Sequence, residues 1–209
     1  MNGQAEIQAA THAMHRDDEG SRMGMWLFLF TELILFGGMF IIYSVYRFSH
    51  QAEFHLAAQE LNTSIGLINT IILLTSSMTM AMSITAIQKD NKLLSMALLS
   101  VTLILAFAFL VNKFFEWSVK FEHGLIPGSK EMMNLPPGEV LYFGLYFVMT
   151  GLHALHVIIG MGILAVNLGF LKRNIVTAQS NVKLETAGLY WHLVDLIWIF
   201  LFPLFYLLH

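Results

Sequence analysis

Five long apolar stretches constrain this chain more than any other feature of its sequence. They span residues 26–45, 65–87, 93–111, 140–171 and 187–208. Each stretch can cross a hydrocarbon core about 30 Å thick as a helix, which takes about 20 residues. None of them alternates polar and apolar residues as the wall of a membrane β-barrel does. The sequence therefore predicts an all-α fold, an integral membrane bundle of five transmembrane helices.

Composition supports a membrane protein and excludes several classes of function. Hydrophobic residues make up 56% of the chain and charged residues 12%, against roughly 25% charged in a soluble domain. The net charge is −3, and no run of Lys or Arg is dense enough to bind along the phosphate backbone of a nucleic acid. We therefore expect no nucleic-acid partner. The chain has no cysteine, which excludes disulfides, Fe–S clusters and thiolate zinc sites.

The N-terminal segment does not resemble a secretory signal, because Asp17, Asp18 and Glu19 precede the first apolar stretch. We expect residues 1–22 to form a cytoplasmic segment and residues 23–209 one five-helix membrane domain. We also expect a loop over residues 46–64 and another over residues 112–139.

Basic residues near the ends of the stretches predict the orientation. Seven lie on the side of the N-terminus and four on the opposite side: Arg16, Arg22, Lys89, Lys92, Lys172, Arg173 and Lys183 against Arg47, Lys113, Lys120 and Lys130. The excess favours the N-terminus in the cytoplasm and the C-terminus outside.

Five ionisable residues fall inside the apolar stretches, where a charge costs about 2.5–3.5 kcal/mol on insertion scales. They are Glu32, His153, His156, His192 and Asp195. Counted at about 1.5 Å per residue, all five fall in the inner half of the bundle, so we expect them to share one polar cluster. At least one of the two histidines of "TGLHALHVIIG" should face the polar residues of stretches 26–45 and 187–208.

Three interpretations of the histidines remain open. His153 or His156 with His192 could bind a haem, or two histidines with Glu32 and Asp195 could bind a non-haem ion. Glu32 and the histidines could instead relay protons. The third interpretation, hydrogen bonds between helices, is favoured by the residues alone.

Other residues have expected structural roles. An isolated buried carboxyl such as Glu32 is expected to be neutral. Lys113 and Glu116, three positions apart, should pair at the outer end of their helix. Small residues including Gly37, Gly38, Gly144, Gly151, Gly160 and Gly162 suit close helix packing. Trp26, Trp117 and Trp191 are expected near the membrane interfaces, and Trp191, like Gly151, is also expected to pack against neighbouring helices or at an interface.

Five segments of the chain resemble subunit III of haem-copper respiratory oxidases, in order and over nearly the whole chain. They are "MWLFLFTELILFGGMF", "NTSIGLINTIILLTSS", "KFFEWSVKFEHGLIPG", "TGLHALHVIIGMGIL" and "LYWHLVDLIWIFLFPLFYLL". Within them, Glu32 matches the family's buried carbodiimide-reactive glutamate. His153 and His156 match its GxHxxHV motif. Trp191, His192 and Asp195 match WHxVDxxW, and Lys113 and Glu116 match the bacterial KxxEW pattern.

The resemblance implies a non-redox subunit of a proton-pumping terminal oxidase, with no catalytic residue and no metal of its own. Haem and copper are then expected in subunit I, the main contact, with subunit II and small subunits as further partners. Electrons would come from cytochrome c, or from quinol, through those other subunits. Expected roles are assembly, binding and organisation of phospholipids, and support of proton uptake by subunit I.

Longer members of the family have seven spans, and this chain matches from the third, so we expect the five-span bacterial form in the inner membrane. In longer members the first two spans form one wall of a lipid cleft. Three alternatives remain: a quinol oxidase subunit III, an accessory subunit of nitric oxide reductase, and a haem-binding subunit similar to cytochrome b.

Overall fold

The computed structural model describes residues 2–122, 124–125 and 128–208, and the side chains of these residues except 2–17, 130 and 131. Its helices follow one another along the chain, and no strand occurs in the described ranges. They are α1 (Asn2–Ser49), α2 (Gln51–Gln59), α3 (Thr63–Gln88), α4 (Lys92–Glu122), α5 (Lys130–Met133), α6 (Pro137–Lys172) and α7 (Val182–Tyr206).

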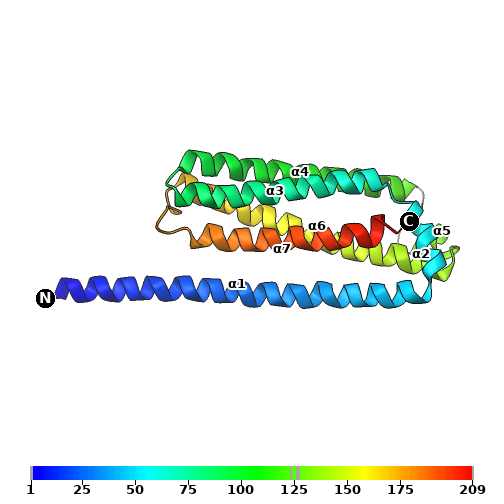
Figure 1. The fold of residues 1–209 in the computed structure, drawn as a ribbon, viewed down its shortest axis with the longest axis horizontal. Coiled ribbons are helices and arrows are strands. Elements are labelled where there is room, and N and C mark those ends of the chain that lie inside the picture. Colours follow the sequence, from blue (N-terminus) through cyan, green and yellow to red (C-terminus); the bar gives the residue numbers. More distant parts are fainter. Residues whose placement is uncertain (1, 123, 126–127, 209) are drawn as a thin grey trace.

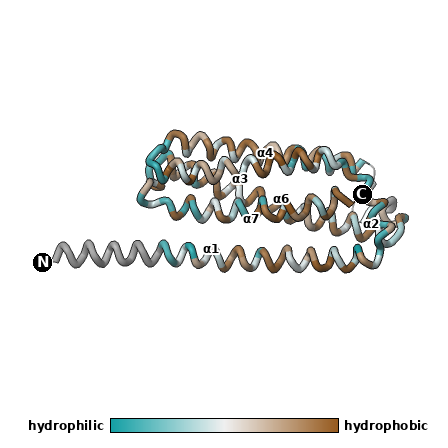
Figure 2. The backbone as a smooth tube through the Cα atoms, in the orientation of Figure 1, coloured by the Kyte–Doolittle hydropathy of each residue, from teal (hydrophilic) through white to brown (hydrophobic). Residues whose placement is uncertain are grey.

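Five of these helices are long and apolar enough to cross a membrane, as the sequence predicts. They are α3, α4, α6, α7 and the part of α1 from Asp18 to Ser49. The helices run side by side, and the two ends of the chain lie at opposite ends of the molecule (Figure 1). Hydrophilic residues gather at the two ends, and the middle is mainly hydrophobic (Figure 2). Both features are expected of a bundle with an odd number of crossings.

Four of the long helices form the core. Helix α3 packs against α4 and α7, and α6 packs against α4 and α7, which closes a ring of four helices. Helix α1 packs outside this ring, on α7 and α6 (Figure 1). Only 11% of the most apolar window of α1 is buried, against 50% for α7. Most of the apolar surface of α1 therefore faces lipid or another protein.

Glycine sets the distance between α6 and α7. A Cβ added to Gly160 would lie 2.9 Å from the Trp191 ring and 3.0 Å from the Tyr190 ring. The prediction for the other glycines is only partly correct. A Cβ on Gly151 would meet Trp117 at an ordinary 3.4 Å, and one on Gly37, Gly38, Gly144 or Gly162 would meet nothing within 4 Å.

The two predicted loops contain helix. Helix α1 continues to Ser49, and α2 then crosses the end of the bundle, with Phe54, Ala57 and Ala58 buried. Helix α4 continues to Glu122, far beyond the expected end at residue 111. The predicted end at residue 111 is wrong because charged residues follow it. A charged residue does not end a membrane helix when its side chain has a partner inside the bundle.

The extension of α4 changes the count of basic residues. Lys113 and Lys120 lie in α4 with exposures of 3% and 5%, so neither is a loop residue. Only Arg47 and Lys130 then remain on the side opposite the N-terminus, and the side chain of Lys130 is outside the described residues. The side chain of Arg16, which was counted on the side of the N-terminus, is also outside the described residues.

Candidate functional site

Glu32 and His156 form a polar contact between α1 and α6. The Glu32 Oε2 atom lies 3.0 Å from His156 Nε2. The other ring nitrogen of His156, Nδ1, lies 2.8 Å from the Leu152 carbonyl oxygen, to which it donates. One proton therefore lies between the two side chains, held either by a neutral Glu32 that donates to imidazole or by an imidazolium that donates to carboxylate. Glu32 is thus not the isolated carboxyl that the sequence suggests.

Aromatic side chains hold this pair in place. The Phe36 ring, one turn after Glu32, contacts the His156 ring edge to face at 5.5 Å. Tyr190 of α7 donates to the His156 carbonyl oxygen at 3.0 Å. The pair is enclosed but not sealed, because the side chains of His156 and Glu32 are 10% and 14% exposed. A small part of each side chain therefore lies at the outer surface of the bundle.

His192 and Asp195 belong to a different contact, between α7 and α3. His192 Nδ1 lies 2.6 Å from the Ser77 hydroxyl oxygen. Asp195 is 3% exposed and lies beside the same serine, but neither carboxyl oxygen forms a hydrogen bond of good geometry with a described residue.

His153 lies apart from both contacts. It is fully buried, with its ring 5.6 Å from the Phe109 ring and 5.2 Å from the Trp198 ring. Neither ring nitrogen has a hydrogen-bond partner in the described part of the chain.

The prediction that these five residues share one polar cluster is therefore wrong. Glu32 and His156 meet, as predicted for at least one histidine, whereas His192 faces α3 and His153 faces α4 and α7. The reason is helix rotation: at 3.6 residues per turn, positions three apart point about 60° apart. His153 and His156 consequently reach different neighbours.

Lys113 and Glu116 form a second buried polar group with two tyrosines. Lys113 Nζ lies 3.0 Å from Glu116 Oε2, 2.9 Å from the Tyr146 hydroxyl and 2.8 Å from the Tyr206 hydroxyl. Both hydroxyls donate to Glu116 Oε1. The pairing is as predicted, but it ties α4, α6 and α7 together inside the bundle, and α4 continues past it to Glu122.

Comparison with known proteins identifies the family. The sequence model of the family described as cytochrome c oxidase subunit III matches residues 4–209. The chain belongs to this family. It is therefore a subunit III of a haem-copper oxidase, part of a respiratory oxidoreductase complex that works with other subunits, and a multi-span membrane protein.

Three similar proteins illustrate the range of oxidases in which the family occurs. Cytochrome c oxidase subunit 3 of Thermostichus vulcanus is 31% identical, with 100% of this chain and 98% of the relative covered. Cytochrome bo(3) ubiquinol oxidase subunit 3 of Pseudomonas aeruginosa is 30% identical, with 93% and 88% covered. Haem-copper oxidase subunit I+III of Aeropyrum pernix is 34% identical over 89% of this chain, which spans only 22% of that longer protein.

Two of the three membrane histidines of this subunit III have hydrogen-bond partners inside the protein. Both nitrogens of His156 already contact protein atoms, and His192 Nδ1 is bonded to Ser77. Within the described ranges, no three residues among His, Cys, Asp and Glu gather as a metal site would require. His156 and His192 thus each make a contact between two helices.

Trp191 packs inside the bundle, although it lies near the end of an apolar stretch in the sequence. It is fully buried, and its indole N–H donates to the Ser76 hydroxyl at 2.8 Å. The expectation of an interfacial Trp191 is therefore wrong, whereas Trp26 is 61% exposed, as expected.

A row of small polar residues on α3 was not predicted. Asn69, Ser76 and Ser83 are all fully buried and lie seven residues apart. Asn69 accepts from Asn112 of α4, and Ser83 bonds to Ser95 of α4 at 3.1 Å. The seven-residue spacing was the available signal, because it keeps side chains on one face of a helix.

Proposed function

We propose that this chain is the non-redox subunit III of a bacterial proton-pumping terminal oxidase. In that complex, other subunits would oxidise cytochrome c and reduce O2 to water. The Thermostichus vulcanus relative, named cytochrome c oxidase subunit 3, supports cytochrome c as donor because it is covered almost end to end. The Pseudomonas aeruginosa relative, named as a ubiquinol oxidase subunit, makes quinol the second candidate.

The contact between Glu32 and His156 is the observation that supports a role in proton uptake. It places a carboxyl and an imidazole, both of which can donate or accept a proton, in contact at the edge of the bundle, at 14% and 10% exposure. We propose that this pair influences proton delivery to subunit I indirectly, while haem and copper reside in partner subunits.

The exposed apolar surface of α1 supports roles in assembly and lipid organisation. Helix α1 carries large exposed apolar side chains along the span, including Leu27, Phe30, Ile34, Ile41 and Phe48. In the membrane, such a surface is covered by lipid or by the helices of another subunit. We propose subunit I as the main contact, with subunit II and small subunits nearby. The N-terminus would lie in the cytoplasm, which the corrected count of basic residues supports.

Replacement of Glu32 tests the role in proton uptake. Glu32→Gln keeps a hydrogen bond to His156 Nε2 but cannot exchange the proton, whereas Glu32→Ala removes both. We expect both variants to assemble and to reduce O2, with faster inactivation during turnover or a partly reduced proton-to-electron ratio. Inactivation and pumping unchanged in both variants would refute the role of the pair. Complete loss of O2 reduction in an assembled Glu32→Gln complex would show a direct role instead.

A further inference from the structure

Helix α7 has one side that the other helices of the bundle leave open. It lies between α1 and α3, which both pack against it but do not pack against each other in the described part of the chain (Figure 1). On the side of α3, His192 is bonded to Ser77, and on the side of α1, the Phe200 ring lies 5.9 Å from the Phe40 ring. The side of α7 between these two contacts therefore faces away from the bundle.

The residues on this open side form a regular stripe, which we call the open face of α7. Counted from the inner end, they are Leu189, His192, Leu196, Ile199 and Pro203, each of them partly or largely exposed. The alternating spacing of three and four residues is the one by which a helix packs against a neighbour in a coiled coil or a membrane bundle. An apolar stripe with this spacing suits lipid as well as a helix, so its polar member decides between them.

His192 places an unpaired polar atom on the open face. Its Nδ1 atom lies 2.6 Å from the Ser77 hydroxyl oxygen, but its Nε2 atom forms no hydrogen bond with a described residue. Nε2 is also not among the polar atoms that are enclosed inside the bundle without a partner. An imidazole nitrogen carries either a proton or a lone pair, and both require a hydrogen-bond partner that hydrocarbon cannot supply. His192 therefore needs a partner from outside this chain.

His192 lies too deep in the membrane for a lipid headgroup to supply that partner. The nearest charged residue of α7 toward the inner end is Glu185, which pairs with Arg22. It precedes His192 by about 10 Å along the helix axis, at 1.5 Å per residue. The exposed side chains nearby on α3 and α7, such as Leu74 and Leu196, are apolar. The partner must therefore come from protein inside the membrane, because the hydrocarbon core holds no water.

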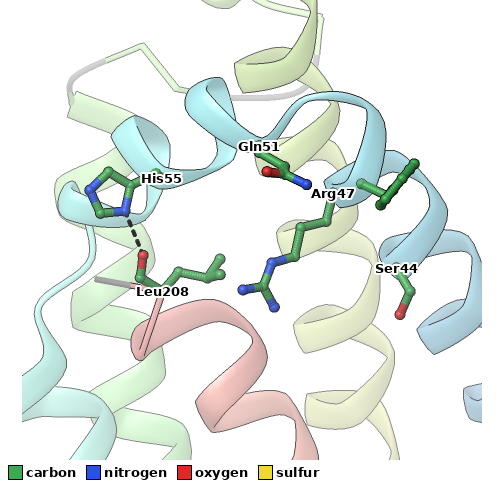
Figure 3. Close-up of a pocket in the computed structure, with 6 residues that line it drawn as sticks. Ser44, Arg47, Gln51, His55 and Leu208 are labelled. Atoms are coloured by element: carbon green, nitrogen blue, oxygen red, sulfur yellow. Dashed lines mark hydrogen bonds between the residues drawn. The ribbon is translucent and has the colours of Figure 1, made fainter.

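Helices α1 and α3 are held in place on either side of the open face. Helix α2 joins them across the end of the bundle, and its His55 Nδ1 atom lies 2.7 Å from the Leu208 carbonyl oxygen just beyond α7 (Figure 3). The Thr63 hydroxyl, at the start of α3, donates to the Tyr206 carbonyl oxygen of α7 at 3.2 Å. These contacts fix α1, α7 and α3 before a partner binds, which lowers the conformational entropy lost on binding.

We propose that the open face of α7 binds one transmembrane helix of another oxidase subunit, which supplies a hydroxyl or carboxamide side chain to His192 Nε2. Both groups can donate and accept, so they fit either tautomer of the imidazole, and bonds of this kind join helices in membrane proteins. A charged side chain would have no counter-charge on this apolar face. The site specifies the assembly role proposed above and rests on it only in that other subunits surround the chain, since neither the electron donor nor the Glu32–His156 pair enters the argument.

Photo-crosslinking tests the site in the intact oxidase complex in its native membrane. The photoreactive amino acid p-benzoylphenylalanine is placed at Leu196 of α7 or Leu74 of α3. The control position is Ile104 of α4, which is also exposed but lies on a helix that does not pack against α7. Crosslinked peptides are mapped by mass spectrometry. We expect positions 196 and 74 to label the same transmembrane segment of another subunit, within one turn of a Ser, Thr, Asn or Gln, and position 104 not to label that segment.

Substitutions of His192 distinguish a partner helix from lipid. If the open face met lipid, His192→Leu would leave the association of subunits unchanged or strengthen it, because leucine suits hydrocarbon better than imidazole. Against a partner helix, His192→Leu should lower the ratio of partner-bound to free subunit III about three-fold, the average size of a hydrogen bond between membrane helices. The ratio is measured on native gels after titration with detergent. His192→Gln, which keeps an outward amide, should restore part of it, and Ile199→Leu on the same stripe is the control that should match the wild type.

Three results would overturn the proposal. The first is crosslinking from positions 196 and 74 to lipid alone, and the second is crosslinking to a second copy of this chain. The third is a ratio of bound to free subunit that is unchanged or higher in His192→Leu. Co-purification is a separate readout: oxidase subunits that co-purify without crosslinking to the open face would refute the docking site alone, whereas their absence from the purified material would refute the proposed function as well.

Discussion

Removing one partner of the buried Lys113–Glu116 pair should destabilise the subunit strongly. Lys113→Met keeps the length of the side chain but deletes the ammonium that lies 3.0 Å from Glu116 and donates to Tyr146 and Tyr206. Glu116 is only 6% exposed, so its carboxylate would stay in the bundle without a counter-charge. Breaking a buried pair in this way costs about 3–5 kcal/mol.

Removing both charges should cost much less. In Lys113→Met combined with Glu116→Gln, the amide oxygen still accepts from the two tyrosine hydroxyls, and no charge is left in the interior. Replacing a whole buried pair is often close to neutral, so we expect a cost within about 2 kcal/mol. The two substitutions should therefore be coupled by more than about 1 kcal/mol in a double-mutant cycle.

The free energy of unfolding can be measured by titration from a mild detergent into sodium dodecyl sulfate, followed by tryptophan fluorescence. Lys120→Met is the control on the same helix. Lys120 is also buried, but among the described residues its ammonium donates only to the Glu60 carbonyl oxygen, at 3.2 Å, so its loss should cost about 1 kcal/mol. A Lys113→Met variant within about 1 kcal/mol of the wild type, or a double variant less stable than Lys113→Met, would refute the reasoning.

Further predictions concern contacts between helices. Gly160→Ala should destabilise the subunit by about 1–3 kcal/mol, because its Cβ would lie 2.9 Å from the Trp191 ring, whereas Gly162→Ala should be neutral in the same titration. Trp191→Phe should cost at least about 1 kcal/mol, because it deletes the bond to a buried serine hydroxyl. Arg22→Gln should cost at most about 1 kcal/mol, with no difference from the wild type in high salt, because its pair with Glu185 is 55% and 26% exposed.

The spans could be predicted from the sequence because a membrane helix must satisfy its own backbone and match the bilayer, and both needs are local. The helix ends could be predicted less well, because they depend on contacts that are not local. Lys113 and Glu116 look like a boundary when each is judged alone, but each supplies what the other needs inside the bundle. That compensation depends on Tyr146 and Tyr206, which lie on other helices.

The grouping of the polar residues could be predicted only in part. Depth follows from counting residues, and it correctly brought Glu32 and His156 to the same level. Direction depends on how each helix is rotated against its neighbours, which packing determines. Gly160 and Trp191 set the contact between α6 and α7, while His192 turns toward Ser77. The spacing of residues in the sequence does not show how each helix is rotated against its neighbours.

We propose that this chain acts beside the redox centres of a haem-copper oxidase and holds none itself. The absorption spectrum of the overexpressed chain, purified alone, tests this proposal, and mass spectrometry identifies the subunits that co-purify with the chain from its native membrane. The chain should co-purify from its native membrane with a haem-copper subunit I in equal amount, and alone it should show no Soret band. Stoichiometric haem in the isolated chain, lost in His192→Ala, would contradict the claim.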